Sequence, residues 1–167
     1  KSTKQACGLL IKDYDKMYNL NYTILQLGSV YGPNSTKKNL ISRLIIESID
    51  NGTMVHYGTG NELRQYIYVK DVIKAAVTTL KHRYNRQKVI LIGKESISIS
   101  ELMDKIISLV GKDVNKIFKI NNYDIHYNTS PFDISSDGAI YFDFKSPTKI
   151  DDGLSYTISS INNNYNK

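Results

Sequence analysis

The sequence predicts an α/β fold with parallel strands, and three observations support this class. Short apolar segments alternate with longer segments whose apolar residues recur at spacings of three and four. The apolar segments at 23–27 and 89–92 carry no charged residue, as is typical of strands buried on both faces of a parallel sheet. The length of 167 residues fits one domain. Strands and helices in alternation indicate the α/β class.

The first predicted helix covers residues 2–18 and ends at Asn19. Its apolar residues fall at helical spacing, at Ala6, Leu10, Tyr14 and Met17. Residues 23–27 then form a short strand, which ends at Gly28. The pair Gly32 and Pro33 predicts a loop after it.

A second helix is predicted over residues 39–49, with Gly52 just past its end. Residues 53–57 and 66–69 have strand composition and are separated by the polar turn 58–61. Asp71 is a candidate N-cap for a helix that runs to about Leu80.

The C-terminal part continues the same alternation. A buried strand at 89–92 ends at Gly93, and the pair Ser98 and Glu101 has the spacing of a capping box at the start of a helix over 98–110. Further short strands and a last helix are predicted at 117–120, 140–144 and 152–161.

The positive charge suits an anionic partner, either a nucleic acid or a diphosphate ligand, although most of the basic residues are expected to form a solvated surface. The net charge is +6, of which residues 1–120 contribute +9 and residues 121–167 contribute −3. The basic residues are scattered and form no dense arm, so no nucleic-acid partner is expected. No apolar run approaches the ~20 residues needed to cross a bilayer, so no membrane partner is expected either.

Cysteine and histidine usage argues against disulfides and metal sites. Cys7 is the single cysteine, which excludes an internal disulfide and favours a reducing, cytoplasmic location. The three histidines, His56, His82 and His126, are far apart in the sequence and have no metal-ligand spacing. We therefore predict no metal site.

Five short motifs follow one another along the chain: Ser-Thr-Lys-Gln-Ala at 2–6, Val-Tyr-Gly-Pro at 30–33, Asn-Leu-Ile at 39–41, Tyr-Gly-Thr-Gly-Asn-Glu-Leu-Arg at 57–64 and Tyr-Val-Lys-Asp at 68–71. Their order and spacing resemble the extended short-chain dehydrogenase/reductases, the NAD-dependent epimerases and dehydratases of nucleotide sugars. The resemblance runs from residue 1 to about 110 and returns near 146–158.

This resemblance implies that residues 1–167 are the C-terminal half of such an enzyme. Elements of the Rossmann-like parallel sheet are expected around 2–30 and 70–93, and elements of the small substrate-binding domain around 31–69 and 94–167. The N-terminal NAD-binding half is absent, in agreement with the lack of a Gly-x-Gly-x-x-Gly turn in the sequence.

The resemblance also assigns catalytic and cofactor-binding residues. The family has a Tyr-x-x-x-Lys pair, and Lys4 matches its lysine, which is catalytic and holds the NAD ribose; its tyrosine would stand just before Lys1. Tyr31 is likewise expected to bind the cofactor. Three further pairs with this spacing, Tyr66/Lys70, Tyr84/Lys88 and Tyr141/Lys145, are expected by chance in a chain with 13 tyrosines.

Arg64 matches the arginine that grips the substrate diphosphate, a task suited to a planar, permanently charged group. The other expected substrate-binding residues are Ser29, Asn39, Leu40, Val55 and Tyr57. Three of these residues have a structural alternative: Arg64 as a surface partner of Glu62, Asn39 as a helix cap, and Tyr57 as strand packing.

The sequence departs from the family at two places. Gln26 and Ser29 stand where many relatives have Arg and Asn before Tyr-Gly-Pro. Relatives often place a second phosphate arginine ahead of a Pro-x-Asp, and the corresponding segment 129–133 has none. One of the two family contacts to the diphosphate is therefore missing.

The expected function is that of an NAD-dependent nucleotide-sugar epimerase or dehydratase in carbohydrate metabolism and polysaccharide biosynthesis. It abstracts a hydride from a sugar carbon and returns it. This chain alone is expected to be inactive, and a homodimer is expected for the full-length protein. The alternative is a non-catalytic relative kept for binding or assembly, which a tyrosine just before Lys1 and a glycine-rich turn upstream would argue against.

Overall fold

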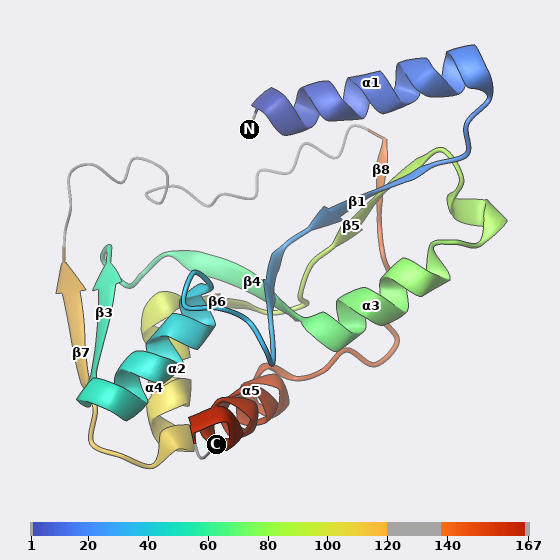
Figure 1. The fold of residues 1–167 in the computed structure, drawn as a ribbon. Helices are drawn as coiled ribbons and strands as arrows, with labels where there is room; N and C mark the ends of the chain where they lie inside the picture. Colours follow the sequence, from blue (N-terminus) through green and yellow to red (C-terminus); the bar gives the residue numbers. More distant parts are fainter. Residues whose placement is uncertain (1, 120–137, 166–167) are drawn as a thin grey trace.

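The computed structural model describes residues 2–119 and 138–165 and has the mixed α/β architecture that the sequence predicts (Figure 1). The helices are α1 (Ser2–Tyr18), α2 (Leu40–Asn51), α3 (Val69–Thr78), α4 (Ile99–Val110) and α5 (Ile150–Tyr165), with a 3₁₀ turn at His82–Tyr84. The strands are β1 (Thr23–Leu27), β2 (Ser29–Tyr31), β3 (Thr53–Tyr57), β4 (Leu63–Tyr68), β5 (Gln87–Leu91), β6 (Ser96–Ser98), β7 (Asn115–Lys119) and β8 (Ala139–Tyr141).

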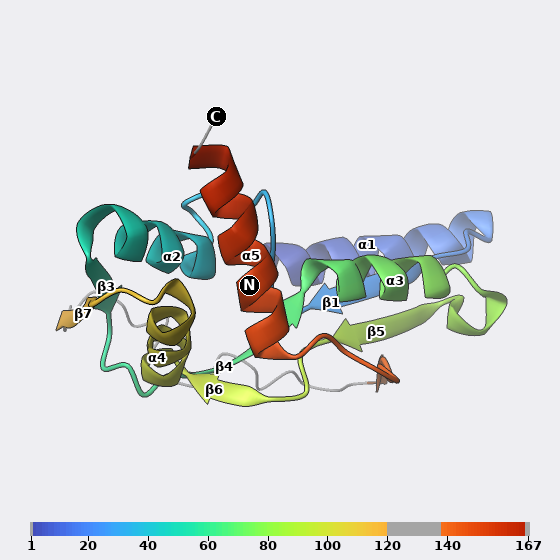
Figure 2. The ribbon, with the colours of Figure 1, turned by 90° about the horizontal axis from the view of Figure 1, so that it is seen from below.

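One parallel sheet has the strand order β1-β5-β8, and Leu25 of β1 pairs with Val89 of β5. Helices α1 and α3 lie on opposite sides of β1 and β5 (Figures 1 and 2). Val89 and Leu91 are fully buried, as the uncharged composition of this strand predicts. Strand β8 lies in the range where substrate-binding elements were expected, and it extends this sheet by pairing in parallel with β5.

The described residues also form two smaller sheets, one of β2, β4 and β6 and one of β3 and β7. Strand β2 pairs in parallel with β4, and β4 pairs antiparallel with β6. Strand β3 pairs with β7 and not with β4, although only five residues separate β3 from β4. The turn after Tyr57 therefore carries the chain from one sheet to another and closes no hairpin. The strand predicted at 117–120 corresponds to β7, which begins earlier, at Asn115. Residue 120 lies outside the described range.

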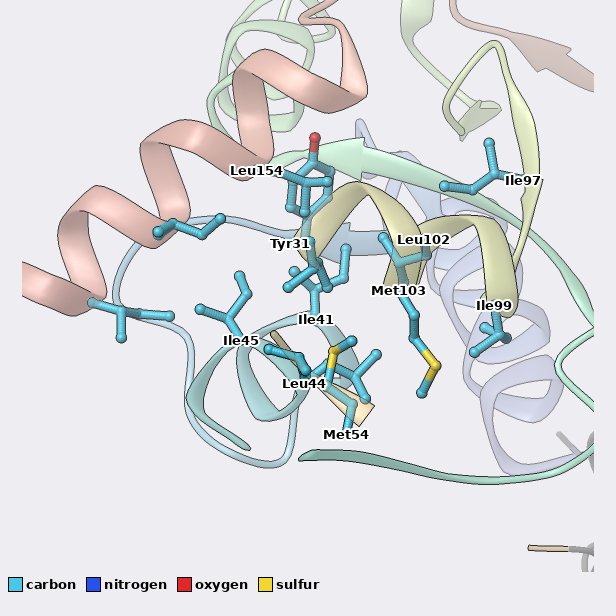
Figure 3. Close-up of a cluster of buried hydrophobic side chains, with 14 of the residues drawn as sticks. Tyr31, Ile41, Leu44, Ile45, Met54, Ile97, Ile99, Leu102, Met103 and Leu154 are labelled. Carbon is cyan, nitrogen blue, oxygen red and sulfur yellow. The ribbon is translucent and has the colours of Figure 1, made fainter. Parts of the chain in front are cut away.

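The main hydrophobic core lies between α2, α4 and α5 (Figures 2 and 3). Its fully buried side chains include Ile41, Leu44, Ile45, Met54, Ile99, Leu102, Met103, Ile106 and Leu154. Tyr31 projects from β2 into this core, and its hydroxyl donates a hydrogen bond to the carbonyl of Ile150 at 3.4 Å. A side chain at Gly153 of α5 would overlap this tyrosine ring, so α5 approaches β2 through a glycine.

Two predicted helix starts have different outcomes. The capping box at the start of α4 is confirmed, because Ser98 accepts from the amide of Glu101 at 3.1 Å while the Glu101 carboxylate accepts from the amide of Ser98. The prediction that Asp71 caps α3 is wrong. Helix α3 starts directly at the end of β4 with Tyr68 as its N-cap, and the buried Asp71 carboxylate instead accepts from the amide of Thr148 at 2.7 Å.

Candidate functional site

A cleft of about 510 Å³ opens between β2, the start of α2, the end of β3 and the start of β4. Five of the predicted substrate-binding residues line it: Ser29, Asn39, Leu40, Tyr57 and Arg64. The other lining residues are Val30, Lys38, Arg43, His56 and Tyr66. Residues that lie up to 37 positions apart in the sequence are thus brought to one surface depression.

Asn39 builds the wall of the cleft where α2 begins. Its side-chain oxygen accepts from the amides of Ile41 and Ser42 at 3.1 and 3.4 Å, so Asn39 is the N-cap of α2. Its amide nitrogen donates to the carbonyl of Val30 at 2.8 Å and ties the helix to β2. The capping role is therefore established in the structure, and one hydrogen of the amide group is left to face a ligand.

Arg64 is 7% exposed and lies on the wall formed by β4. Its Nη1 donates to the carbonyl of Leu63 at 2.8 Å, which orients the guanidinium. Tyr66, two residues further along the strand, projects from the same face of β4 and also lines the cleft. This burial excludes the alternative that Arg64 is a solvated surface arginine.

Glu62 stabilises the turn between β3 and β4 by hydrogen bonds. Its carboxylate accepts from the amides of Thr59 and Gly60 at 2.7 and 2.9 Å, and from His56 Nε2 at 3.3 Å. Although burial raises the pKa of Glu62, hydrogen bonds from its own amide and from the amide and hydroxyl of Thr59 outweigh it and hold the pKa below its ordinary value. Glu62 is therefore ionised and fixes the turn that precedes Arg64.

His56 is buried beside two guanidinium groups. Burial lowers the pKa of His56 below 6.5, and the charges of Arg43 and Arg64 lower it further, whereas Glu62 opposes the shift. Desolvation and the two cations prevail, so His56 is a neutral donor to Glu62 at pH 7, and their 3.3 Å contact is a hydrogen bond rather than an ion pair.

The charges on the cleft are of one sign. Lys38, Arg43 and Arg64 line it, and none of its described lining residues is an aspartate or a glutamate. A concave surface with several cations and no facing carboxylate attracts anions. Arg43 and Lys38 were not predicted as site residues; the spacing of four from Asn39 to Arg43, which puts both on one face of α2, is the signal in the sequence.

Val55 was predicted to contact the substrate, but its side chain does not line the described cleft. Its backbone has a different task. The carbonyl of Val55 accepts from Arg43 Nη1 at 3.0 Å, and its amide donates to Glu47 Oε2 at 3.0 Å. Val55 therefore anchors the arginine that faces the cleft.

The two predicted cofactor residues lie away from the cleft. Lys4 is exposed on α1, which contributes no residue to the lining. Tyr31 is 2% exposed within the main core, so only its backbone remains for a ligand contact. Of the chance Tyr-x-x-x-Lys pairs, Tyr66/Lys70 is not joined by a hydrogen bond, because the buried Tyr66 hydroxyl has no hydrogen-bond partner among the described residues.

Two negative findings apply to residues 2–119 and 138–165. Within them, no three His, Cys, Asp or Glu side chains gather in an arrangement that would hold a metal ion. No helix in the same ranges combines the length and apolar character needed to cross a membrane. The segment 129–133, where relatives carry a second arginine, lies outside the described residues.

The fold is shared with known nucleotide-sugar enzymes. The crystal structure of UDP-glucuronic acid 4-epimerase from Bacillus cereus, in complex with UDP-glucuronic acid and NAD, superimposes with a TM-score of 0.79 at 24% identity and covers 98% of this chain. The chain covers 52% of that protein. At this identity, the likeness is one of fold.

Curated relatives point the same way. UDP-glucuronate 4-epimerase of Thermodesulfobacterium geofontis is 23% identical over 158 residues, which are 95% of this chain and 48% of the relative. Human dTDP-D-glucose 4,6-dehydratase is 26% identical over 131 residues, 78% of this chain and 37% of the relative. The chain thus spans about half the length of these relatives or less. The sequence profile of the NAD dependent epimerase/dehydratase family matches residues 1–93, more than half of the chain, and this chain accordingly belongs to that family.

Proposed function

We propose that this chain is the sugar-nucleotide-binding half of an NAD-dependent epimerase or dehydratase, and that its cleft holds the diphosphate of a nucleotide sugar. The observation that carries this proposal is the buried Arg64 on a cleft that is also lined by Lys38 and Arg43 and has no aspartate or glutamate among its described lining residues. Charge-assisted, bidentate hydrogen bonds to phosphate are the usual task of an arginine in this setting.

The nucleotide and the sugar occupy the walls on either side of the diphosphate in this proposal. Tyr57 is 45% exposed at the end of β3 and offers a ring face to the base. Ser29 and Asn39 offer polar groups from β2 and the start of α2.

The residues of this chain match only part of an NAD-binding site. The sequence has no Gly-x-Gly-x-x-Gly turn, Tyr31 is buried, and Lys4 is the one predicted cofactor residue whose side chain is exposed. When bound, NAD accepts a hydride from a sugar carbon and returns it. We assign no step of that reaction to this chain beyond binding the substrate, and we expect no turnover of UDP-glucose by residues 1–167 alone.

The exposed apolar side chains of α1 are explained by the same proposal. Leu9, Leu10, Tyr14, Met17 and Tyr18 are each more than half exposed. Apolar surface of this kind on a soluble protein indicates a face that another part of the protein covers. In the full-length protein, we propose that the cover comes from the NAD-binding half and from a second subunit of a homodimer.

Calorimetric titration of the purified protein with UDP-glucose tests this function. We expect saturable binding that UDP competes with and that free uridine and glucose do not, because the diphosphate carries the main contact. A protein that is folded by circular dichroism but shows no saturable binding would contradict the proposal.

A further inference from the structure

Arg43 lies on the second turn of α2, and half of its guanidinium is already fixed. Its Nη1 donates to the carbonyl of Val55 at 3.0 Å and to Glu47 Oε1 at 3.0 Å. The other oxygen of Glu47 accepts from the amide of Val55 at 3.0 Å. The arginine and its partner thus form a closed ring of hydrogen bonds with one residue of β3.

The other half of the guanidinium is available to a ligand. Arginine has five N–H donors in a planar fork, and the contacts to Val55 and Glu47 use only those of Nη1. The side chain is 28% exposed and lines the cleft, whereas Glu47 is not among the described lining residues. Arg43 therefore lines the cleft, while its carboxylate partner Glu47, 3.0 Å from Nη1, accepts from the amide of Val55 in β3.

Arg43 and Arg64 line the same cleft. Both line it, and the charges of both lower the pKa of His56, which is buried beside them. Arg64 comes from β4 and Arg43 from α2, so the two cations approach His56 from different elements. A diphosphate ester carries one negative charge on each of its two phosphoryl groups and thus matches two guanidinium groups in number.

The chain has two other arginines, and both are engaged elsewhere. Arg86 Nε donates to the carboxylate of Asp15 at 2.8 and 2.9 Å. Arg83 lies 4.7 Å from the centre of the Tyr84 ring and donates to its hydroxyl. Since segment 129–133 contains no arginine, Arg43 is the remaining candidate for a second guanidinium at the cleft.

We infer that Arg43 is a substrate-binding residue that forms, with Arg64, a two-arginine clamp on the diphosphate of the nucleotide sugar. This inference rests on the proposed function. Glu47 and the backbone of Val55 are the positioning groups, because they fix Nη1. The clamp assigns the donors of Nε and Nη2 to the ligand. In this chain, the clamp is completed from α2 instead of from the segment where relatives carry their second arginine.

The test measures the Kd for UDP-glucose by calorimetry in Arg43→Gln, Arg43→Lys, Glu47→Gln and Arg83→Gln, each with its melting temperature. Arg43→Gln is expected to raise Kd at least about tenfold, the scale of a charge-assisted hydrogen bond. Arg83→Gln removes the same charge far from the cleft and is the matched control, with Kd expected to stay within about twofold on the scale of a distant surface charge.

Glu47→Gln separates a ligand contact from a structural role. If Arg43 only joined α2 to β3, Glu47→Gln and Arg43→Gln would weaken binding equally, and that result would overturn the inference. The clamp instead predicts a much smaller effect for Glu47→Gln, because Arg43 keeps its charge and its bond to Val55. Arg43→Lys keeps the fold if Arg43→Gln does not, and it should still bind weakly, since one ammonium cannot hold Val55 and the phosphate together.

The outcomes distinguish the two proposals. Failure of the unmodified protein to bind UDP-glucose contradicts the proposed function, and the clamp with it. Binding by the unmodified protein that Arg43→Lys leaves unchanged refutes the clamp alone and leaves the function of the cleft standing.

Discussion

The amide nitrogen of Asn39 lies 2.8 Å from the carbonyl oxygen of Val30, while its oxygen caps the first turn of α2. One side chain thus fixes the helix that carries Arg43 to the strand that carries Ser29. The position of the cleft walls depends on this residue whether or not it also contacts a nucleotide.

Replacing Asn39 should therefore reduce stability, by an amount that depends on how many of its hydrogen bonds are lost. Asn39→Ser keeps a capping oxygen but loses the bond to Val30, and should reduce the free energy of unfolding by about 1 kcal/mol. Asn39→Ala loses both and should cost about 2 kcal/mol. Urea unfolding of the two variants measures the difference; equal stabilities for Asn39→Ala and the unmodified protein would show that the side chain is not a structural tie.

Gly153 tests the approach of α5 to β2. Glycine to alanine within a helix normally stabilises by about 1 kcal/mol. At Gly153 we expect the opposite sign, a loss of about 1–3 kcal/mol, because the new methyl group overlaps the buried ring of Tyr31.

Gly8→Ala in α1 is the matched control for this change. The nearest atom to a methyl group at Gly8 is Ile24 Cδ1 at 3.9 Å, an ordinary contact, so this variant should be more stable than the unmodified protein. Adding Tyr31→Phe to Gly153→Ala should restore part of the loss, since the hydroxyl is the nearest overlapping atom. Opposite signs for the two glycines in thermal melts support the packing, and a stabilised Gly153→Ala contradicts it.

His56 predicts a pH dependence of ligand binding. Burial, Arg43 and Arg64 hold its pKa below 6.5 in the free protein, so it is neutral at pH 7.5, and a bound diphosphate raises that pKa because the anion favours the imidazolium. Binding then takes up a proton once the pH falls to the raised pKa of the complex, and affinity increases as the pH falls further towards the pKa of the free protein.

The measurement compares the Kd for UDP-glucose at pH 7.5 and pH 6.0. Its esterified phosphoryl groups do not titrate in this range, and Glu62 stays ionised because its pKa is lowered. We expect affinity to rise about threefold at pH 6.0, well within the free energy of a one-unit pKa shift. His56→Gln should remove the difference, and a variant that retains it would assign the dependence to another group.

The sequence predicted most elements of the fold, since their signals are local. The helix at Ser98 is fixed by its own capping box, and the strand at Thr23 by its composition. Strands β2 and β6 were not predicted, because three residues are too few to show a period and each is a strand only through its pairing with β4. Asp71 was misassigned for a similar reason: its partner, Thr148, lies 77 residues away.

The candidate site, too, was predicted from the sequence only in part. Family spacing identified Arg64, and the structure places it in a cleft with Ser29 and Asn39. Arg43 was missed because its spacing from Asn39 indicates only a shared face of α2, while its contact with Val55 depends on how α2 packs against β3. Tyr31 belongs to a cofactor motif by sequence, yet the core formed with α5 encloses its side chain.

The most direct test of the diphosphate site is the Kd of Arg64→Ala for UDP-glucose, with Arg83→Ala as the control. Both values are measured by calorimetry on protein shown to be folded by circular dichroism. Loss of a charge-assisted contact of about 1.5–3 kcal/mol predicts a Kd raised about 10- to 100-fold for Arg64→Ala. Arg83, which stacks on Tyr84 outside the cleft, should leave Kd unchanged. If folded Arg64→Ala binds UDP-glucose as tightly as the unmodified protein, the cleft is not the diphosphate site.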